Sequence, residues 1–155
     1  MDSAAPAIDP RIPELGATDP DASVAGVIGA VSVRFGAATE ALLNKRVERA
    51  AEQFRALIGL LAQADALSSQ RGPSPRSVKD FLVAIEAAAA DEREAAVALG
   101  APVGEAFRLG HSMRCFGRAT PALVAGDDRA AHEALVSCGA TVLALVSDLR
   151  YVGGI

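Results

Sequence analysis

The chain has 155 residues, which is enough for one domain whose core needs neither disulfides nor a metal. Apolar residues make up 51% of it and aromatic residues only 4%, so small alanine side chains supply much of the apolar surface and each helix contact buries little area. The net charge of −4 equals the balance of five acidic residues and one arginine within residues 1–21, and the near-neutral remainder excludes the broad basic surface typical of nucleic-acid or anionic-membrane binding.

Residues 1–21 have the composition of a disordered, flexible arm, because four prolines interrupt them and no hydrophobic period is sustained. A role as a partner-binding or export segment is the alternative. The chain does not begin with a basic stretch followed by an apolar run, so we expect no cleaved secretory signal. The uncharged run 22–33 is too short to span a bilayer, and two cysteines fit a reducing compartment. We expect a cytoplasmic protein, with export that uses no cleaved signal left open.

Residues 22–42 fit a helix or a strand. A stripe of apolar residues at four- and three-residue spacing favours a helix that Asp21 or Ser23 caps. The stripe consists of Val24, Ile28, Val31, Phe35, Ala38 and Leu42. Alternation over 31–35 and the β-branched residues favour a strand. No other stretch supplies a partner strand, so we favour the helix.

The next stretch carries the clearest pattern in the chain, a heptad seam of apolar residues over 43–64. The seam consists of Leu43, Val47, Ala50, Phe54, Leu57, Leu61 and Ala64. It is rotated by about 100° from the preceding stripe, one residue at 3.6 residues per turn. Either one long helix presents a second face, or it breaks near Gly36 and restarts from Thr39.

Turn signals divide the remainder into three helical segments. The sequence around 71–75 stops the first long helix, and Ser74 with Pro75, or Ser77 with Asp80, starts a helix that ends before Gly100. A shorter helix is expected over 103–118, and Thr120 followed by Pro121 predicts a kink or a new turn.

The last helix repeats the heptad spacing and is expected to be buried on most of its circumference, since residues 134–146 carry no charge. Its apolar positions are Ala131, Leu135, Cys138, Val142, Leu145, Leu149 and Val152. The sequence therefore predicts an all-α bundle of about four helices with a long first helix, as one domain over 22–152, followed by a frayed tail at 153–155.

The sequence gives only a weak signal for a metal site or a redox pair. His111 and Cys115 share a helix face at four-residue spacing, but two further ligands would have to come from His132 and Cys138, which are six residues apart and out of register. Cys115 and Cys138 lack the C-x-x-C spacing of a redox pair. Phosphate-binding loops and nucleophile elbows are absent from the sequence. We therefore expect no metal, no cofactor and no catalytic residues.

The segment 103–118 is locally basic through Arg108, Arg114 and Arg118, whereas the preceding helix is acidic. An anion or nucleic-acid contact through these arginines is one interpretation, but interleaved aromatic residues that stack bases are absent. The favoured interpretation is that the two segments are antiparallel neighbours with complementary charge.

These observations predict a non-catalytic interaction or assembly protein, such as a scaffold, an adaptor, a chaperone or an exported helical subunit. It would bind itself or a partner helix through the apolar seams, and nucleic acid is not an expected partner. The seam residues are Val47, Phe54, Leu57, Leu61, Leu135, Val142, Leu145 and Leu149. The simpler interpretation is that all eight form the core of a monomer.

The alternative function is a ligand sensor with an apolar pocket. Its lining would be Phe107, Met113, Phe116 and Cys138.

Overall fold

The structure, a computed structural model, describes residues 23–70, 74–99 and 105–152. In this part of the chain every regular element is a helix, which confirms the all-α prediction. The helices are α1 (Val24–Leu43), α2 (Val47–Ser69), α3 (Val78–Leu99), α4 (Glu105–Ala125) and α5 (Asp128–Val152). The expected arm at 1–21 and tail at 153–155 lie outside the described residues. Residues 24–42 belong to α1, so the strand interpretation of this stretch is wrong.

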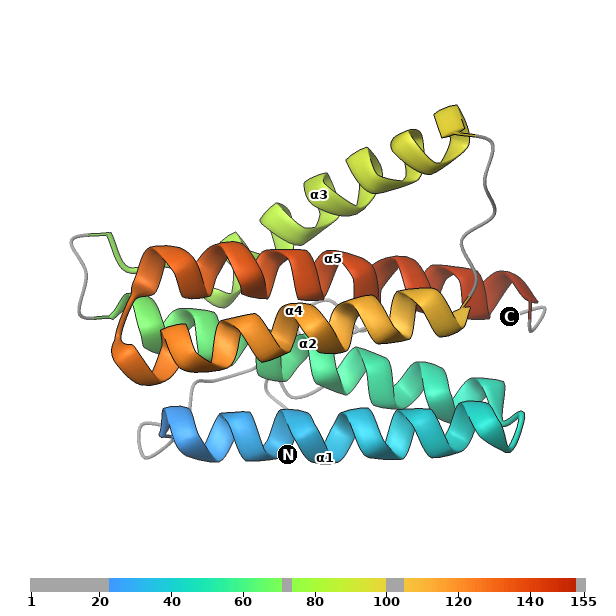
Figure 1. Ribbon diagram of the computed structural model, residues 1–155, viewed down its shortest axis with the longest axis horizontal. Coiled ribbons are helices and arrows are strands. Elements are labelled where there is room, and N and C mark those ends of the chain that lie inside the picture. Colours follow the sequence, from blue (N-terminus) through green and yellow to red (C-terminus); the bar gives the residue numbers. More distant parts are fainter. Residues whose placement is uncertain (1–22, 71–73, 100–104, 153–155) are drawn as a thin grey trace.

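Four helices form an antiparallel ring in the order α1, α2, α5, α4 (Figure 1). α1 and α2 form one hairpin, α4 and α5 form the other, and α2 packs against α5. The ring closes poorly, because α1 and α4 meet far less extensively than the other neighbouring pairs. This leaves the side between α1 and α4 open.

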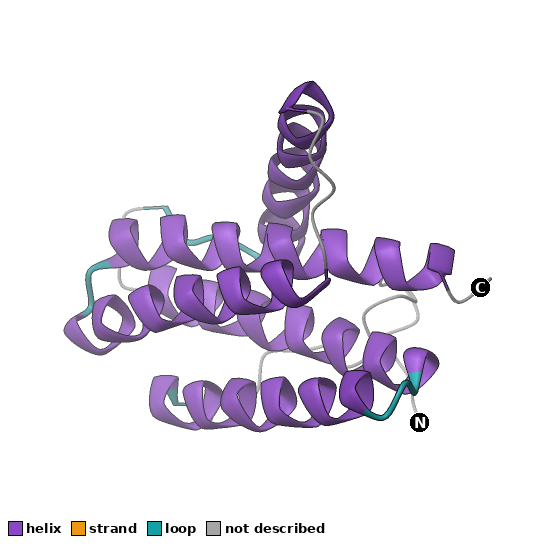
Figure 2. Ribbon diagram, turned by 45° about the vertical axis from the view of Figure 1, so that its right-hand side comes forward, coloured by secondary structure: helices purple, strands orange, loops and turns teal. Residues whose placement is uncertain are grey.

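α3 lies outside this ring. Its first half packs against α5 and α2 through Phe81, Ile85 and Ala89, and its second half diverges from the body in both views (Figures 1 and 2). α3 and α4 are therefore not packed neighbours, and the prediction that their opposite charges face one another is wrong. The reason is topological, since α4, the next helix along the chain, occupies another side of α5.

The predicted long first helix is two helices, and the break lies at 44–46, not near Gly36. The amide of Lys45 bonds the carbonyl of Leu42 at 3.0 Å, and the amide of Arg46 bonds the carbonyl of Ala41 at 2.8 Å. This pair of bonds is a Schellman motif, which normally places glycine in its left-handed position. Here Lys45 occupies that position with φ 58°. Leu43, the first residue of the predicted seam, is 78% exposed at this corner.

Replacing Lys45 with glycine is expected to raise the free energy of unfolding by about 1 kcal/mol, because glycine enters the left-handed region without the steric cost that a Cβ carries. Urea denaturation of K45G and wild type measures the difference. K45A is the control and keeps wild-type stability, since alanine retains the Cβ. Equal stability of K45G and K45A would contradict the prediction.

The other predicted helix boundaries are mostly correct. Ser23 caps α1, accepting a hydrogen bond from the amide of Gly26 at 3.0 Å. Ser77 and Asp80 form a reciprocal capping box at the start of α3, with bonds of 2.8 and 3.1 Å. Pro121 is the exception, because α4 runs through it to Ala125 and no new helix starts there. Its ring lies on the exposed side of α4, where the missing amide bond is tolerated.

α5 is buried against three other helices, as its uncharged sequence predicts. It approaches α3 most closely at Gly139, where a Cβ would lie 2.8 Å from Cγ2 of Ile85 and 3.2 Å from Cζ of Phe81. The short β-branched end of Ile85 cannot swing away from such a contact. Gly139 therefore sets the distance between the two helices.

Replacing Gly139 with alanine is expected to lower the free energy of unfolding by about 1–3 kcal/mol, because overpacking outweighs the better helix propensity of alanine. G117A is the matched control, since Gly117 is exposed within α4 and a Cβ there meets no atom within 4 Å. It is expected to gain up to about 1 kcal/mol. Thermal unfolding of both variants measures the changes in stability. The prediction is contradicted if both variants are stabilised or both are destabilised.

Candidate interaction site

The open side of the helical ring carries a groove of about 580 Å³ between α1 and α4. We name it the α1/α4 groove. It is lined by Ser32, Phe35, Gly36, Thr39, Glu40 and Leu43 from α1, and by Met113 and Phe116 from α4. Most of these side chains are small or apolar, and the one charged member is Glu40. The groove is thus suited to an apolar occupant and not to an ion.

Two aromatic rings form the floor of this groove. Phe35 and Phe116 are 4% and 7% exposed, and their ring centroids lie 6.2 Å apart at a tilt of 50°. Such a tilted pair is a favourable aromatic arrangement. It anchors α1 to α4 where they touch, while Leu43 and Met113 at the rim are exposed to 78% and 48%. The floor is fixed and the rim is adaptable.

α1 is the most apolar helix that the bundle leaves uncovered. Both α1 and α5 are long and apolar enough to cross a membrane by length and composition alone. In α5, 56% of the residues in the apolar stretch are buried, which explains its composition as that of a core helix. In α1 only 28% are buried. Its outer face is therefore apolar without a covering element among the described residues.

The predicted heptad seams exist, but their residues pack against one another inside a single chain. Seven of the eight seam residues are at most 1% exposed, and Val47 is partly buried against the same core. The seven are Phe54, Leu57, Leu61, Leu135, Val142, Leu145 and Leu149. Residues that pack α2 against α5 are not available to a partner while the chain is folded. Any surface that contacts another molecule therefore has to lie outside these seven residues.

Of the four residues predicted to line a ligand pocket, the groove unites two, Met113 and Phe116. Phe107 is 61% exposed and stacks on His111, with centroids 6.2 Å apart. Cys138 is fully buried, and this burial raises the pKa of its thiol, with a smaller contribution from Cys115. The Cys138 thiol is therefore neutral and unreactive near neutral pH.

The three arginines of α4 do not form one patch. Arg108 is 5% exposed, and its Nε lies 3.0 Å from Oδ2 of Asp148 on α5. Arg114 is exposed, and Arg118 donates a hydrogen bond to Sγ of Cys115 at 3.2 Å. An anion contact through all three would require Arg108 to leave Asp148.

The proposed ligand pair on α4 is close, but no third or fourth metal ligand joins it in the described part. Sγ of Cys115 lies 3.6 Å from Nε2 of His111. Among the described residues no group of three or more histidine, cysteine or acidic side chains has the geometry of a metal site. His132 belongs instead to a polar network at the other end of the ring.

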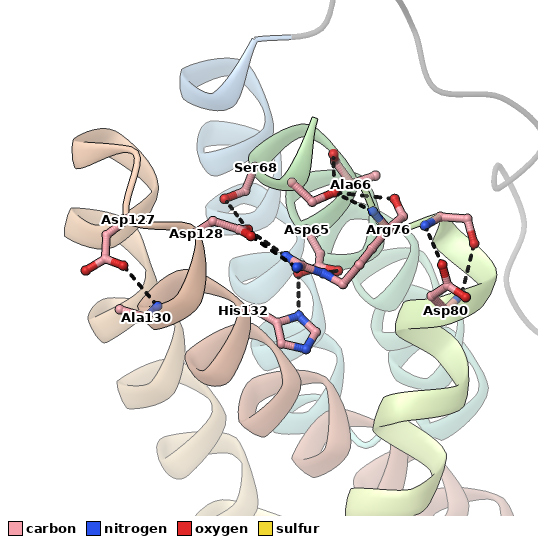
Figure 3. A network of polar contacts seen from close by, with 11 residues as sticks. Asp65, Ala66, Ser68, Arg76, Asp80, Asp127, Asp128, Ala130 and His132 are labelled. Atoms are coloured by element: carbon pink, nitrogen blue, oxygen red, sulfur yellow. Dashed lines mark hydrogen bonds and ion pairs between the residues drawn. The ribbon is translucent and has the colours of Figure 1, made fainter. Parts of the chain in front are cut away.

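This polar network joins α2 and α5 to the segment just before α3 (Figure 3). Arg76 is its centre, donating paired hydrogen bonds to Asp65 at 3.0 and 3.0 Å and to Asp128 at 3.1 and 2.6 Å. Nδ1 of His132 lies 2.7 Å from Oδ1 of Asp65. Ser68 donates to Asp128 at 3.1 Å. The network fixes the loop before α3 onto the ends of α2 and α5.

The network is a structural clamp and not an open binding site, because its charged atoms satisfy one another. Asp65 is completely buried, and the side chain of Arg76 is 23% exposed. Hydrogen bonds from Arg76, and then Ser68, lower the pKa of Asp128, while Asp128 and Asp65 raise the pKa of Arg76. The Arg76 guanidinium and the Asp128 carboxylate are thus held ionised near neutral pH.

Stability is expected to fall in acid because two carboxyl groups have a folded pKa below the unfolded value. Hydrogen bonds with Ser77 lower the pKa of Asp80, and those from Arg76 lower that of Asp128. Such groups stabilise the fold fully above their unfolded pKa of about 3.9 and lose this effect as pH falls through the folded pKa. The urea midpoint is therefore expected to be steady above about pH 5 and to fall below about pH 4.

The variant Asp128→Asn separates the contribution of the Asp128 carboxyl group to the acid loss of stability from the contribution of all other groups. The variant is expected to be less stable at neutral pH and to show a shallower acid decline than wild type, because its side chain cannot titrate. D91N, at an exposed position of α3, is the control and keeps the wild-type profile. An unchanged acid slope in D128N would contradict the prediction.

Sequence reasoning missed this network, because its members are far apart in the chain. Asp65 and Arg76 are separated by 11 positions, and Asp65 and His132 by 67. One signal was present: Asp65 follows Ala64 on the buried side of α2, where an unpaired acid is costly. That position implies a cationic partner without identifying it.

Comparison with known proteins finds no matching family model, no matching curated protein and no matching solved structure.

Proposed function

We propose that this protein is a non-catalytic helical interaction protein that binds a helix, from a partner or from another copy of itself, in the α1/α4 groove. Scaffold, adaptor, chaperone and exported-subunit roles all share this activity. The observation that carries the proposal is that α1 is apolar along its length while only 28% of its apolar stretch is buried. An apolar helix face that the rest of the fold leaves uncovered is typical of interaction sites.

The shape of the groove supports a helix as its occupant. It runs beside α1 from Ser32 to Leu43, about three turns, with aromatic rings at its floor and Met113 at its rim. Grooves of this kind accept the apolar face of an amphipathic helix. The flexible thioether of Met113 suits it to partners of differing shape.

A displayed library of amphipathic helices, selected against the full chain, tests the proposal. Selected helices are expected to bind at least tenfold more weakly to M113E, because a carboxylate at the rim would have to be desolvated. S137E is the control and retains binding, since Ser137 is exposed on α5 and does not line the groove. The proposal fails if neither a helix nor a second copy binds in a way that M113E weakens.

An apolar small molecule is the second candidate occupant, because the groove volume of about 580 Å³ falls within the range of ligand pockets. It is expected to raise the melting temperature of wild type and not of M113E. Stabilisation by small apolar compounds, with no helix bound at the groove, would favour the sensor over the interaction protein.

A further inference from the structure

We infer that the occupant of the α1/α4 groove is a second copy of this chain, held by antiparallel contact between the two α1 helices about a two-fold axis near residue 34. This inference rests on the proposed function, because it identifies the helix that fills the same groove. Each α1 would lie beside α1 and α4 of the other copy. The two exposed helices would cover one another.

The outer face of α1 carries its own series of residues at four- and three-residue spacing. The series is Ala25, Gly29, Ser32, Gly36, Thr39 and Leu43, of which Thr39 is partly buried and the others are exposed. Two helices with such a series can pack along it, and small side chains allow close approach. A Cβ at Gly29 or Gly36 would meet no atom of its own chain within 4 Å, so space is open at both positions.

An antiparallel pair matches large residues of this series with small ones. An axis near residue 34 places Leu43 opposite Ala25 of the other copy, Thr39 opposite Gly29, and Ser32 opposite Gly36. Alternation of large and small residues across a contact fills space without strain. In a parallel pair, each residue instead faces its own copy, so Leu43 meets Leu43 and the glycines leave gaps.

Charge favours the same orientation. Among the described residues, Glu40 is the one charged residue that lines the groove, and α1 has no acidic residue in its first turn. Antiparallel packing places Glu40 level with residue 28 of the other copy, at the start of the second turn of that helix and about 6 Å from its positive N-terminal end. A parallel pair would instead set Glu40 opposite Glu40, which is repulsive.

The available area fits a dimer of modest affinity. α1 is 20 residues long, hence about 30 Å, and a strip two helix diameters wide covers roughly 600 Å² per copy. Stable interfaces of standard size bury about 800 Å² per partner. We therefore expect a dissociation constant in the micromolar range and a mass that depends on concentration.

Sedimentation equilibrium of the full chain, from low micromolar to near-millimolar concentration, tests the dimer. Wild type is expected to shift from monomer to dimer, and G36R to remain monomeric throughout. G36R is expected to fold, because the Cβ space is open and arginine favours a helix more than glycine does. A87R is the control, since Ala87 is exposed on α3, outside the groove. It is expected to dimerise like wild type.

Two further variants test the orientation. E40Q is expected to weaken an antiparallel dimer by about 3- to 5-fold through the lost interaction with both N-termini, whereas a parallel dimer would become tighter. Under oxidising conditions S32C, near the axis, is expected to form a covalent dimer and A25C is not. The two copies of residue 25 would be about 27 Å apart along the helices in the antiparallel pair.

The outcomes separate this inference from the proposed function. A wild type that stays monomeric at all concentrations, while selected helices still bind the groove, overturns the second copy and leaves the interaction proposal standing. A dimer that survives in G36R overturns the inference, because another surface must then hold it. Binding of wild type, but not G36R, to phosphatidylcholine vesicles in place of dimerisation also overturns it, since the face would then bind lipid.

Discussion

Replacing Arg76 with methionine is expected to lower the free energy of unfolding by about 3–5 kcal/mol, because the substitution leaves a buried carboxylate without its main partner. Asp65 is completely buried and accepts two hydrogen bonds from the guanidinium at 3.0 Å. The same substitution also releases Asp128. Methionine fills a similar volume, so the loss reflects charge more than packing. Urea denaturation at neutral pH measures it.

A surface ion pair on α5 provides the matched control for R76M. Arg129 and Glu133 lie 3.8 Å apart with side chains 93% and 68% exposed. R129M is expected to change stability by less than about 0.5 kcal/mol, as exposed pairs usually do. If R76M lost as little stability as R129M, water would be replacing the hydrogen bonds of Arg76. That result would contradict the role of the network as a clamp.

A double-mutant cycle assigns the loss to the pairing itself. Asp65→Asn removes the buried charge, so R76M in the D65N background is expected to cost less than R76M alone. His132 still contacts position 65 in both backgrounds, which keeps the comparison balanced. Additive losses would mean that Arg76 stabilises the loop before α3 independently of Asp65.

The helices were predictable because their signals are local. The apolar positions of α5 recur at heptad spacing, and all those described from Ala131 to Leu149 are buried in the structure. The capping box from Ser77 to Asp80 is a four-residue pattern, one of the two starts expected for this helix, and it forms in the structure. Such features depend on neighbours along the chain and not on how the helices assemble.

The helix break and the groove were not predictable in the same way. Gly36 is a typical breaker, but Phe35 and Ala38 on either side of it are buried, and their packing keeps the helix continuous. The break falls at Lys45, where the residue type does not indicate a left-handed backbone. The groove depends on which helices fail to touch, and the spacing within α1 and α4 does not contain that information.

Replacing Phe54 with alanine is expected to lower the free energy of unfolding by about 3–5 kcal/mol, because the change leaves a cavity in the core. Phe54 is completely buried in α2, in the cluster that joins both hairpins. An interface residue would behave differently, since its truncation would alter the oligomer mass at near-constant stability of the folded monomer. Denaturation at low protein concentration, with mass measured separately, distinguishes these cases.

M113A is the matched control for the opposite behaviour. Met113 is 48% exposed at the rim of the α1/α4 groove. Its truncation is therefore expected to lower the free energy of unfolding by well under half the amount expected for F54A, and to weaken dimer formation. The two variants thus separate the residues that fold the chain from those that bind its partner. If F54A weakened association and left unfolding unchanged, the heptad seam of α2 would be the interface, and the α1/α4 groove would not.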